Sequence, residues 1–97
     1  MDRDSIIRDF EDYIDKYQLD YSEIYVGITN DVERRLFQEH QVPKDHYWWI
    51  YSPADNNDIA RKVEQYFISK GCQGGSGGGD DSSNIVYAYK TSSITNP

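Results

Sequence analysis

The sequence predicts an α+β domain in which a three-stranded sheet is flanked by three helices. Apolar residues recur at helical spacing in three segments, residues 5–17, 30–40 and 58–70. Alternating or strongly aromatic runs, typical of strands, fill residues 22–29, 45–52 and 84–90. Helices and strands therefore alternate along the chain. Its 97 residues allow one domain with one modest core.

Charge and cysteine usage restrict the possible functions. The formal net charge of −7 argues against a broad basic surface of the kind that nucleic-acid-binding proteins usually carry. Local charge can differ, since two predicted helices carry Arg34, Arg35, Arg61 and Lys62. The single cysteine, Cys72, excludes an intramolecular disulfide and fits a reducing compartment. With no apolar run long enough to span a membrane and an acidic start, we expect a cytoplasmic protein without membrane partners.

The first half of the chain supplies an extra N-terminal helix, a strand and a second helix. Residues 5–17 form the first helix, with Asp4 or Ser5 as its cap. In residues 22–29, alternate side chains point to opposite faces, so that Tyr25 and Gly27 share one face. The apolar side chains on the other face are Ile24, Val26 and Ile28. We expect the second helix to start at Asn30, which forms a capping box with Glu33.

The second half supplies two strands around a third helix. Residues 45–52 are aromatic on both faces, which predicts a central strand. A Gly-rich loop at 71–83 follows the third helix, with Gly71 suited to the helix C-cap. This loop is either a flexible connector or a wrap of backbone N–H groups around an anion. Residues 91–97 are expected to form a loose tail.

The segment from Ile24 to Leu36, Ile-Tyr-Val-Gly-Ile-Thr-Asn-Asp-Val-Glu-Arg-Arg-Leu, resembles the second half of the GIY-YIG nuclease signature. In that family a strand ending in Tyr-Ile/Val-Gly leads into a helix with an essential arginine eight residues after the glycine. That position is Arg35 here. A histidine usually follows four residues later, where this chain has Glu39, and His40 comes next.

The residue types suit the chemistry that the resemblance implies. Gly27 has no side chain, so a substrate backbone could approach Tyr25 closely. Arg35 lies at the margin of an apolar stripe, where its planar fork can reach a phosphate, with Arg34 beside it as a further substrate contact. The alternative is a half-buried sheet tyrosine and a surface arginine without catalytic roles.

The third helix carries a candidate metal ligand, Glu64. Family members place a metal-binding glutamate on such a helix, with an alanine four residues before it and two apolar residues three and four after it. Ala60, Phe67 and Ile68 match that pattern. A carboxylate among apolar neighbours is costly unless it is paired or metal-bound, and Mg²⁺ prefers oxygen ligands. The alternative is a salt bridge with Arg61, Lys62 or Arg35.

The family's first motif, a Gly-Ile-Tyr strand, is missing from its usual place. Residues 84–89 could replace it by pairing antiparallel to residues 23–29, which amounts to a circular permutation. Tyr87 would then stand in for the first-motif tyrosine, and the three-stranded sheet would be mostly antiparallel. The alternative is that Tyr87 is an ordinary strand tyrosine.

The resemblance implies a divalent-metal-dependent endonuclease using Mg²⁺ or Mn²⁺ on DNA, or less expectedly on RNA. Tyr25 and Tyr87 would position or activate water, Arg35 would stabilise phosphate charge, His40 would assist, and Glu64 would hold the metal. Asp80 or Asp81 could add a second metal ligand. Two alternatives stay open: an inactive binding module of the same fold, and a protein-interaction domain using the aromatic strand and the acidic first helix.

Overall fold

The computed structural model describes residues 1–74 and 82–97 and confirms the predicted α+β class. Its sheet contains β1 (Ile24–Thr29), β2 (Trp49–Pro53) and β3 (Ile85–Lys90), all antiparallel, in the order β1-β3-β2. The helices are α1 (Arg3–Lys16), α2 (Asn57–Ser69) and η2 (Glu33–Glu39), and a short 3-10 turn, η1 (Tyr21–Glu23), precedes β1. Helix α1 starts two residues earlier than expected, because the Asp2 side chain accepts from the Ser5 backbone N–H.

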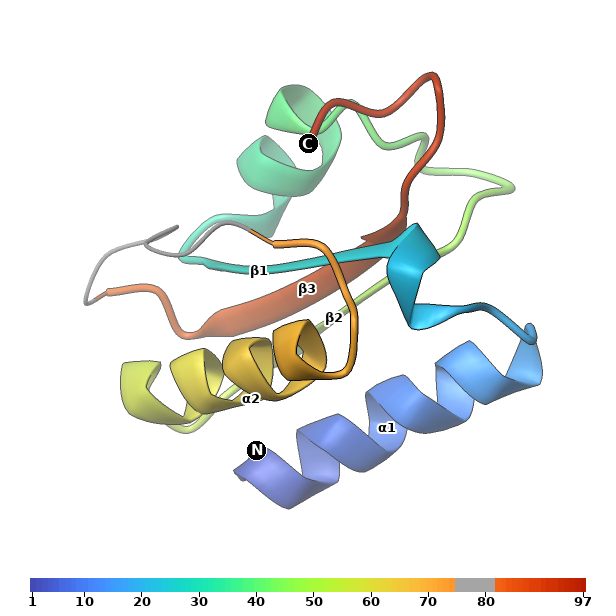
Figure 1. The fold of residues 1–97 in the computed structure, drawn as a ribbon. Coiled ribbons are helices and arrows are strands. Elements are labelled where there is room, and N and C mark those ends of the chain that lie inside the picture. Colours follow the sequence, from blue (N-terminus) through green and yellow to red (C-terminus); the bar gives the residue numbers. More distant parts are fainter. Residues whose placement is uncertain (75–81) are drawn as a thin grey trace.

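One apolar cluster lies on each face of the sheet. Helices α1 and α2 cover one face and η2 covers the other (Figure 1). Val26, Ile28 and Val86 belong to the larger cluster under α1 and α2, whereas Tyr87 and Tyr89 belong to the smaller cluster with Leu36 of η2. The strand alternation read from the sequence therefore holds, and it places the tyrosines of β1 and β3 on the η2 face.

The C-terminal strand occupies the centre of the sheet. As predicted, β3 pairs antiparallel with β1, and its register places Gly27 opposite Tyr87. The prediction of a central strand at 45–52 was wrong, because β2 lies at the sheet edge and begins only at Trp49. His46 has a φ of +57°, which interrupts extended backbone before that point. Both faces of this segment are nevertheless covered, since Trp48 packs on Tyr13 of α1 and Trp49 packs on Phe37 of η2.

Helix η2 differs from the ordinary helix expected over residues 30–40. It is a π-helix, a wide form with i→i+5 hydrogen bonds. Asn30 does not cap it and instead donates to the Ser82 hydroxyl at 2.9 Å. The Asp31 carboxylate takes the capping role by accepting from the Arg34 backbone N–H at 3.1 Å.

The segment after β3 is held in place, which corrects the expectation of a loose tail at 91–97. The backbone N–H of Thr91 donates to the Glu23 carbonyl at 2.7 Å, and that of Asn96 donates to the His40 carbonyl at 2.7 Å. Gly71 has a φ of +116°, in keeping with its predicted position at the end of α2. Most of the Gly-rich loop, with Asp80 and Asp81, lies outside the described residues. No helix in the described part of the chain is long and apolar enough to cross a membrane.

Candidate functional site

Tyr87 is the centre of the candidate site. It is 0% exposed, and its ring reaches across β1 over Gly27, its cross-strand partner. A Cβ at position 27 would lie 2.6 Å from the Tyr87 Cζ atom, so only glycine leaves room for the ring. The space over Gly27 is thus filled by Tyr87, and the predicted direct approach of a substrate backbone at Gly27 is not what the structure shows.

The Tyr87 hydroxyl joins two residues of the predicted site. The Arg35 Nε–H donates to it at 3.2 Å, and the His40 Nε2 lies 2.7 Å from it. His40 Nδ1 lies 2.8 Å from the Asn96 carbonyl oxygen, which can only accept, so we assign the ring proton to Nδ1. Nε2 then has a free lone pair that accepts the Tyr87 hydroxyl proton. Arg35, Tyr87, His40 and the Asn96 carbonyl form one continuous hydrogen-bonded chain.

The π-helix explains why His40 can take part although it is five residues after Arg35. The His40 backbone N–H donates to the Arg35 carbonyl at 3.0 Å, an i→i+5 bond. In a π-helix, the residue five positions after Arg35 lies about one turn further along the same face. In an α-helix, the residue four positions on would lie there. Both side chains therefore reach the same hydroxyl. π-helical segments occur often at functional sites.

Two further tyrosines enclose the histidine. The Tyr25 ring lies with its centroid 4.8 Å from that of His40 and 5.3 Å from that of Tyr89. The Tyr89 hydroxyl lies 3.0 Å from His40 Nδ1. The structure thus brings together Tyr25, Arg35, His40 and Tyr87. Tyr89 was not among the predicted site residues, although its position two residues after Tyr87 on one strand face was the available signal.

Burial keeps the His40 imidazole and the Tyr87 hydroxyl of this network uncharged. Desolvation lowers the pKa of His40, and the nearby Arg35 charge lowers it further, so the imidazole is neutral at pH 7. Burial raises the pKa of Tyr87 to about 12, although the Arg35 hydrogen bond opposes that shift. The hydrogen bond that Arg35 donates to the Tyr87 oxygen is the leading cause that raises the pKa of Arg35, so the guanidinium stays charged.

One carboxylate of η2, that of Glu39, pairs with both arginines and offsets half of their charge. Glu39 accepts from the Arg35 Nη1 at 2.7 Å and pairs with the Arg34 Nε at 3.0 Å. Arg34 is exposed and its Nε pairs with Glu39 rather than with Tyr87, so the structure does not bring it into the network. Glu39 was not predicted as a site residue, but its i,i+4 spacing from Arg35 is typical of a helical ion pair.

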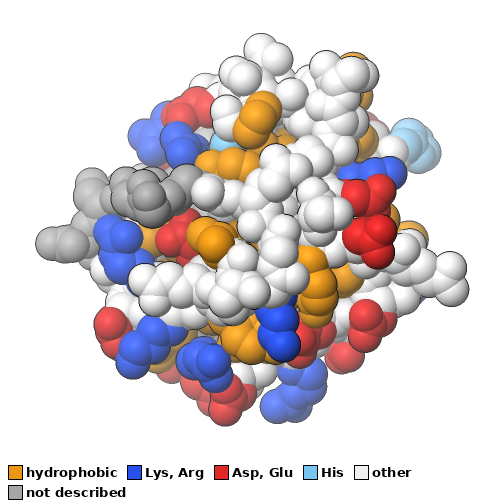
Figure 2. Space-filling view, viewed as in Figure 1, with side chains coloured by type: hydrophobic (Ala, Val, Ile, Leu, Met, Phe, Trp, Pro, Cys, Tyr) orange, Lys and Arg blue, Asp and Glu red, His pale blue; other side chains and the backbone are white. Residues whose placement is uncertain are grey.

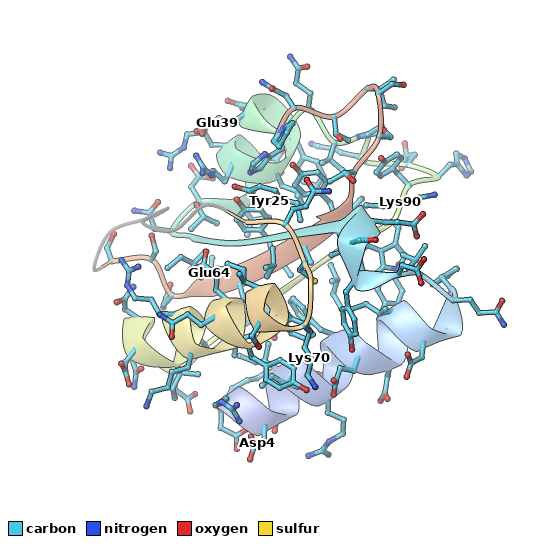
Figure 3. The ribbon with its side chains drawn as sticks, viewed as in Figure 1. Asp4, Tyr25, Glu39, Glu64, Lys70 and Lys90 are labelled. Atoms are coloured by element: carbon cyan, nitrogen blue, oxygen red, sulfur yellow. The ribbon has the colours of Figure 1, made fainter. Side chains whose placement is uncertain are left out.

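Glu64 comes from the opposite side of the sheet. Figure 3 shows Tyr25 and Glu39 on the η2 side and Glu64 on α2. Glu64 is 4% exposed, and its Oε2 has no hydrogen-bond partner among the described residues. Desolvation raises its pKa to about 7, and the Arg61 charge opposes that shift. The predicted partners Lys62 and Arg35 pair instead with Asp58 and Glu39. No hydrogen bond or ion pair in the described part of the chain joins Glu64 to the Tyr87 network, and its charge contributes less than burial to the raised pKa of Tyr87.

Among the described residues the donor set offers one candidate ligand for a divalent cation and no dedicated metal centre. Within residues 1–74 and 82–97, no group of three or more His, Cys, Asp or Glu side chains could hold a metal. Glu64 alone offers a buried carboxylate oxygen without a partner in that part of the chain. Mg²⁺ is commonly bound by one or two carboxylates, with water and substrate phosphate oxygens completing its shell. Glu64 therefore fits as a single protein ligand.

Comparison with known proteins adds no assignment. No protein-family model, curated protein or solved structure matches this chain. The surface gives no simple answer either, since Lys and Arg side chains are interspersed with Asp and Glu on the face shown in Figure 2. Function has to be argued from the Tyr87 network and Glu64 themselves.

Proposed function

We propose that the chain is a divergent, circularly permuted GIY-YIG-type nuclease domain that hydrolyses phosphodiester bonds, in DNA more than in RNA. The observation that carries the proposal is the hydrogen-bonded chain from Arg35 through the Tyr87 hydroxyl to His40. Its members come from η2 and β3, and β1 and β3 pair in the antiparallel register that the permutation requires. The buried free thiol of Cys72 supports a cytoplasmic setting.

The residues of the network have separable roles in this proposal. Tyr87 accepts a proton from the attacking water as its own hydroxyl proton passes to Nε2 of neutral His40. Arg35, which donates to the Tyr87 oxygen, stabilises the negative charge that develops on that oxygen during the transfer and offers its remaining N–H groups to the phosphate. Tyr25 packs on the His40 ring and keeps it oriented. Mg²⁺ or Mn²⁺, held by Glu64, would supply Lewis-acid stabilisation of phosphate charge.

The decisive experiment measures cleavage of labelled single-stranded, duplex and branched DNA with Mg²⁺, Mn²⁺ or EDTA. We expect Arg35→Ala, Tyr87→Phe and Glu64→Gln each to reduce cleavage by roughly a hundredfold or more. Arg8→Ala on α1 and Lys62→Ala on α2 are matched controls, since both side chains are exposed and lie outside the network. Cleavage that survives in all three site variants would disprove the proposal.

A binding module without turnover is the second candidate. It is favoured by the full burial of Tyr87 and by the pairing of Arg35 with Glu39, which together leave little of the network open to a substrate. Retained DNA binding with no cleavage under any metal would support this candidate. Binding should then weaken in Arg35→Ala but be unchanged in Tyr87→Phe, because the phosphate contact depends on the guanidinium alone.

A further inference from the structure

An aromatic pocket lies away from the Tyr87 network, between the C-terminal half of α1 and the segment leading into β2. Its volume is about 340 Å³, and it is lined by Tyr13, Tyr17, His46, Tyr47 and Trp48. Tyr13 stacks on Trp48 with ring centroids 4.9 Å apart, and Tyr17 meets Tyr13 edge-on at 5.2 Å. Tyr17 is 52% exposed, so this aromatic wall reaches the surface. None of its residues serves the proposed catalytic role.

Negative charge adjoins this aromatic pocket. A neighbouring hollow of about 410 Å³ shares Tyr13 with it and is also lined by Asp9, Asp12, Lys16 and Ile50. Asp9 and Asp12 are exposed, and neither forms an ion pair within the described part of the chain. The first 20 residues contain seven acidic and three basic side chains, which gives this region a net charge of 3 − 7 = −4.

One of these rings, that of Tyr17, already contacts a cation within the protein. The Lys16 ammonium lies 5.5 Å from the centroid of the Tyr17 ring, within the range of a cation–π contact. The electron-rich ring faces and the nearby carboxylates thus both favour a positively charged ligand. A phosphate-bearing ligand would be repelled by Asp9 and Asp12. A second copy of this chain would bring its own −7 charge to the surface.

We propose that this surface binds an arginine-containing basic segment of a partner protein. An arginine side chain fits the pocket because its planar guanidinium stacks on aromatic faces and stays charged. Flanking basic residues of the segment would pair with Asp9 and Asp12. The surface is a second functional region, and Tyr47 of its lining also packs against the apolar cluster that contains Tyr87.

The test is fluorescence anisotropy of a short labelled arginine-rich peptide titrated with the full chain. A matched peptide in which citrulline replaces arginine keeps the shape and removes the charge. We expect the citrulline peptide to bind at least roughly tenfold more weakly, and Tyr17→Ala to weaken the arginine peptide roughly three- to tenfold. Tyr51→Ala is the matched control, because Tyr51 is 49% exposed but lies on β2 outside the pocket. It should change affinity less than about twofold.

A second variant separates charge from ring contacts. Asp9→Asn combined with Asp12→Asn should weaken the arginine peptide and flatten the salt dependence of its affinity. The Arg35→Ala variant should bind the peptide like the parent chain, whether or not the nuclease proposal holds. Equal affinity for the arginine and citrulline peptides, or an equal loss in Tyr17→Ala and Tyr51→Ala, would overturn the inference, as would no binding of either peptide.

Discussion

At the scale of single residues, burial makes the Tyr87 phenol a weak acid. Its pKa is raised to about 12 by burial, so almost none of it is ionised at pH 7. Arg35 and neutral His40 are the groups that ease loss of its proton. Any reaction through Tyr87 is therefore governed by how readily that proton leaves.

We predict that cleavage rises steadily with pH between about 6 and 9. Two ionisations raise the cleavage rate as pH rises. Tyr87 has a pKa of about 12, so the fraction of it that is ionised grows throughout this range. Glu64, with a pKa of about 7, becomes a metal ligand only when ionised. The measurement is a pH-rate profile with saturating Mn²⁺. A rate that falls across this range would contradict proton removal by Tyr87. Glu64→Gln should lose the lower part of the rise.

Glu64 also predicts how stability depends on pH. Its pKa is raised from an ordinary value of 4.5 to about 7. The unfolded chain therefore ionises first, and stability is lost as pH rises from 4.5 through 7. The loss is about 3 kcal/mol at most. The lowered pKa of His40 works in the opposite sense, since stability is lost as pH falls through it.

Urea unfolding at several pH values should separate these effects. Glu64→Gln removes the Glu64 contribution, so its free energy of unfolding should exceed that of the parent near pH 8 and match it more closely near pH 4. The same parent-minus-variant difference at both pH values would show that Glu64 is not desolvated in the folded chain.

At the scale of elements, β1 and β3 fit together because one strand lacks a side chain where the other has a ring. Gly27→Ala places a methyl group against the buried Tyr87 ring, which has no exposed direction in which to move. We predict a loss of about 1–3 kcal/mol in the free energy of unfolding. The loss should shrink in a Tyr87→Leu background, because leucine stops short of position 27. Additive losses in the double variant would mean that the two residues do not conflict.

At the scale of the whole molecule, charge sets how the chain can bind nucleic acid. The net charge is −7, and of the two arginines on η2 only Arg35 is directed into the network. We predict weak DNA binding with a shallow salt dependence, a slope of about −1 to −2 in log K against log salt concentration, measured by anisotropy in EDTA. A slope several times steeper would require a basic contact surface beyond Arg34 and Arg35.

The sequence was sufficient for the layers of the fold but not for its local geometry. Alternation in β1 and β3 correctly separated the apolar face from the tyrosine face, because a period of two directly assigns sides. The π-helix was not predictable, since the apolar spacing of Val32, Leu36 and Phe37 suits an ordinary helix equally well. Strand order also escaped prediction, because aromatic content reports packing on helices as readily as a central position in a sheet.

The candidate residues could be proposed where a motif or a strand pattern marks the side chain, and not where the contact is made by irregular backbone or depends on how a helix packs. The spacing from Gly27 to Arg35 identified η2, and pairing of β3 with β1 identified Tyr87. The Asn96 carbonyl could not be found, because the tail has no periodicity and its contribution comes from the backbone. Glu64 was placed on its helix correctly, but which face of the sheet that helix covers depends on long-range packing.

The Asn96 contact makes the protonation pattern of the histidine depend on the carboxyl-terminal segment. Shortening the chain after Ser93 would remove the Asn96 carbonyl that accepts from Nδ1 and the Asn96 N–H bond to the His40 carbonyl, and would leave the Tyr89 hydroxyl as the partner of Nδ1. The ring could then turn its N–H toward Tyr87, making His40 a donor where it had been a proton acceptor. A change confined to the carboxyl-terminal backbone would thus change which imidazole nitrogen is free to accept a proton, and nitrogen-15 shifts of the imidazole would report it.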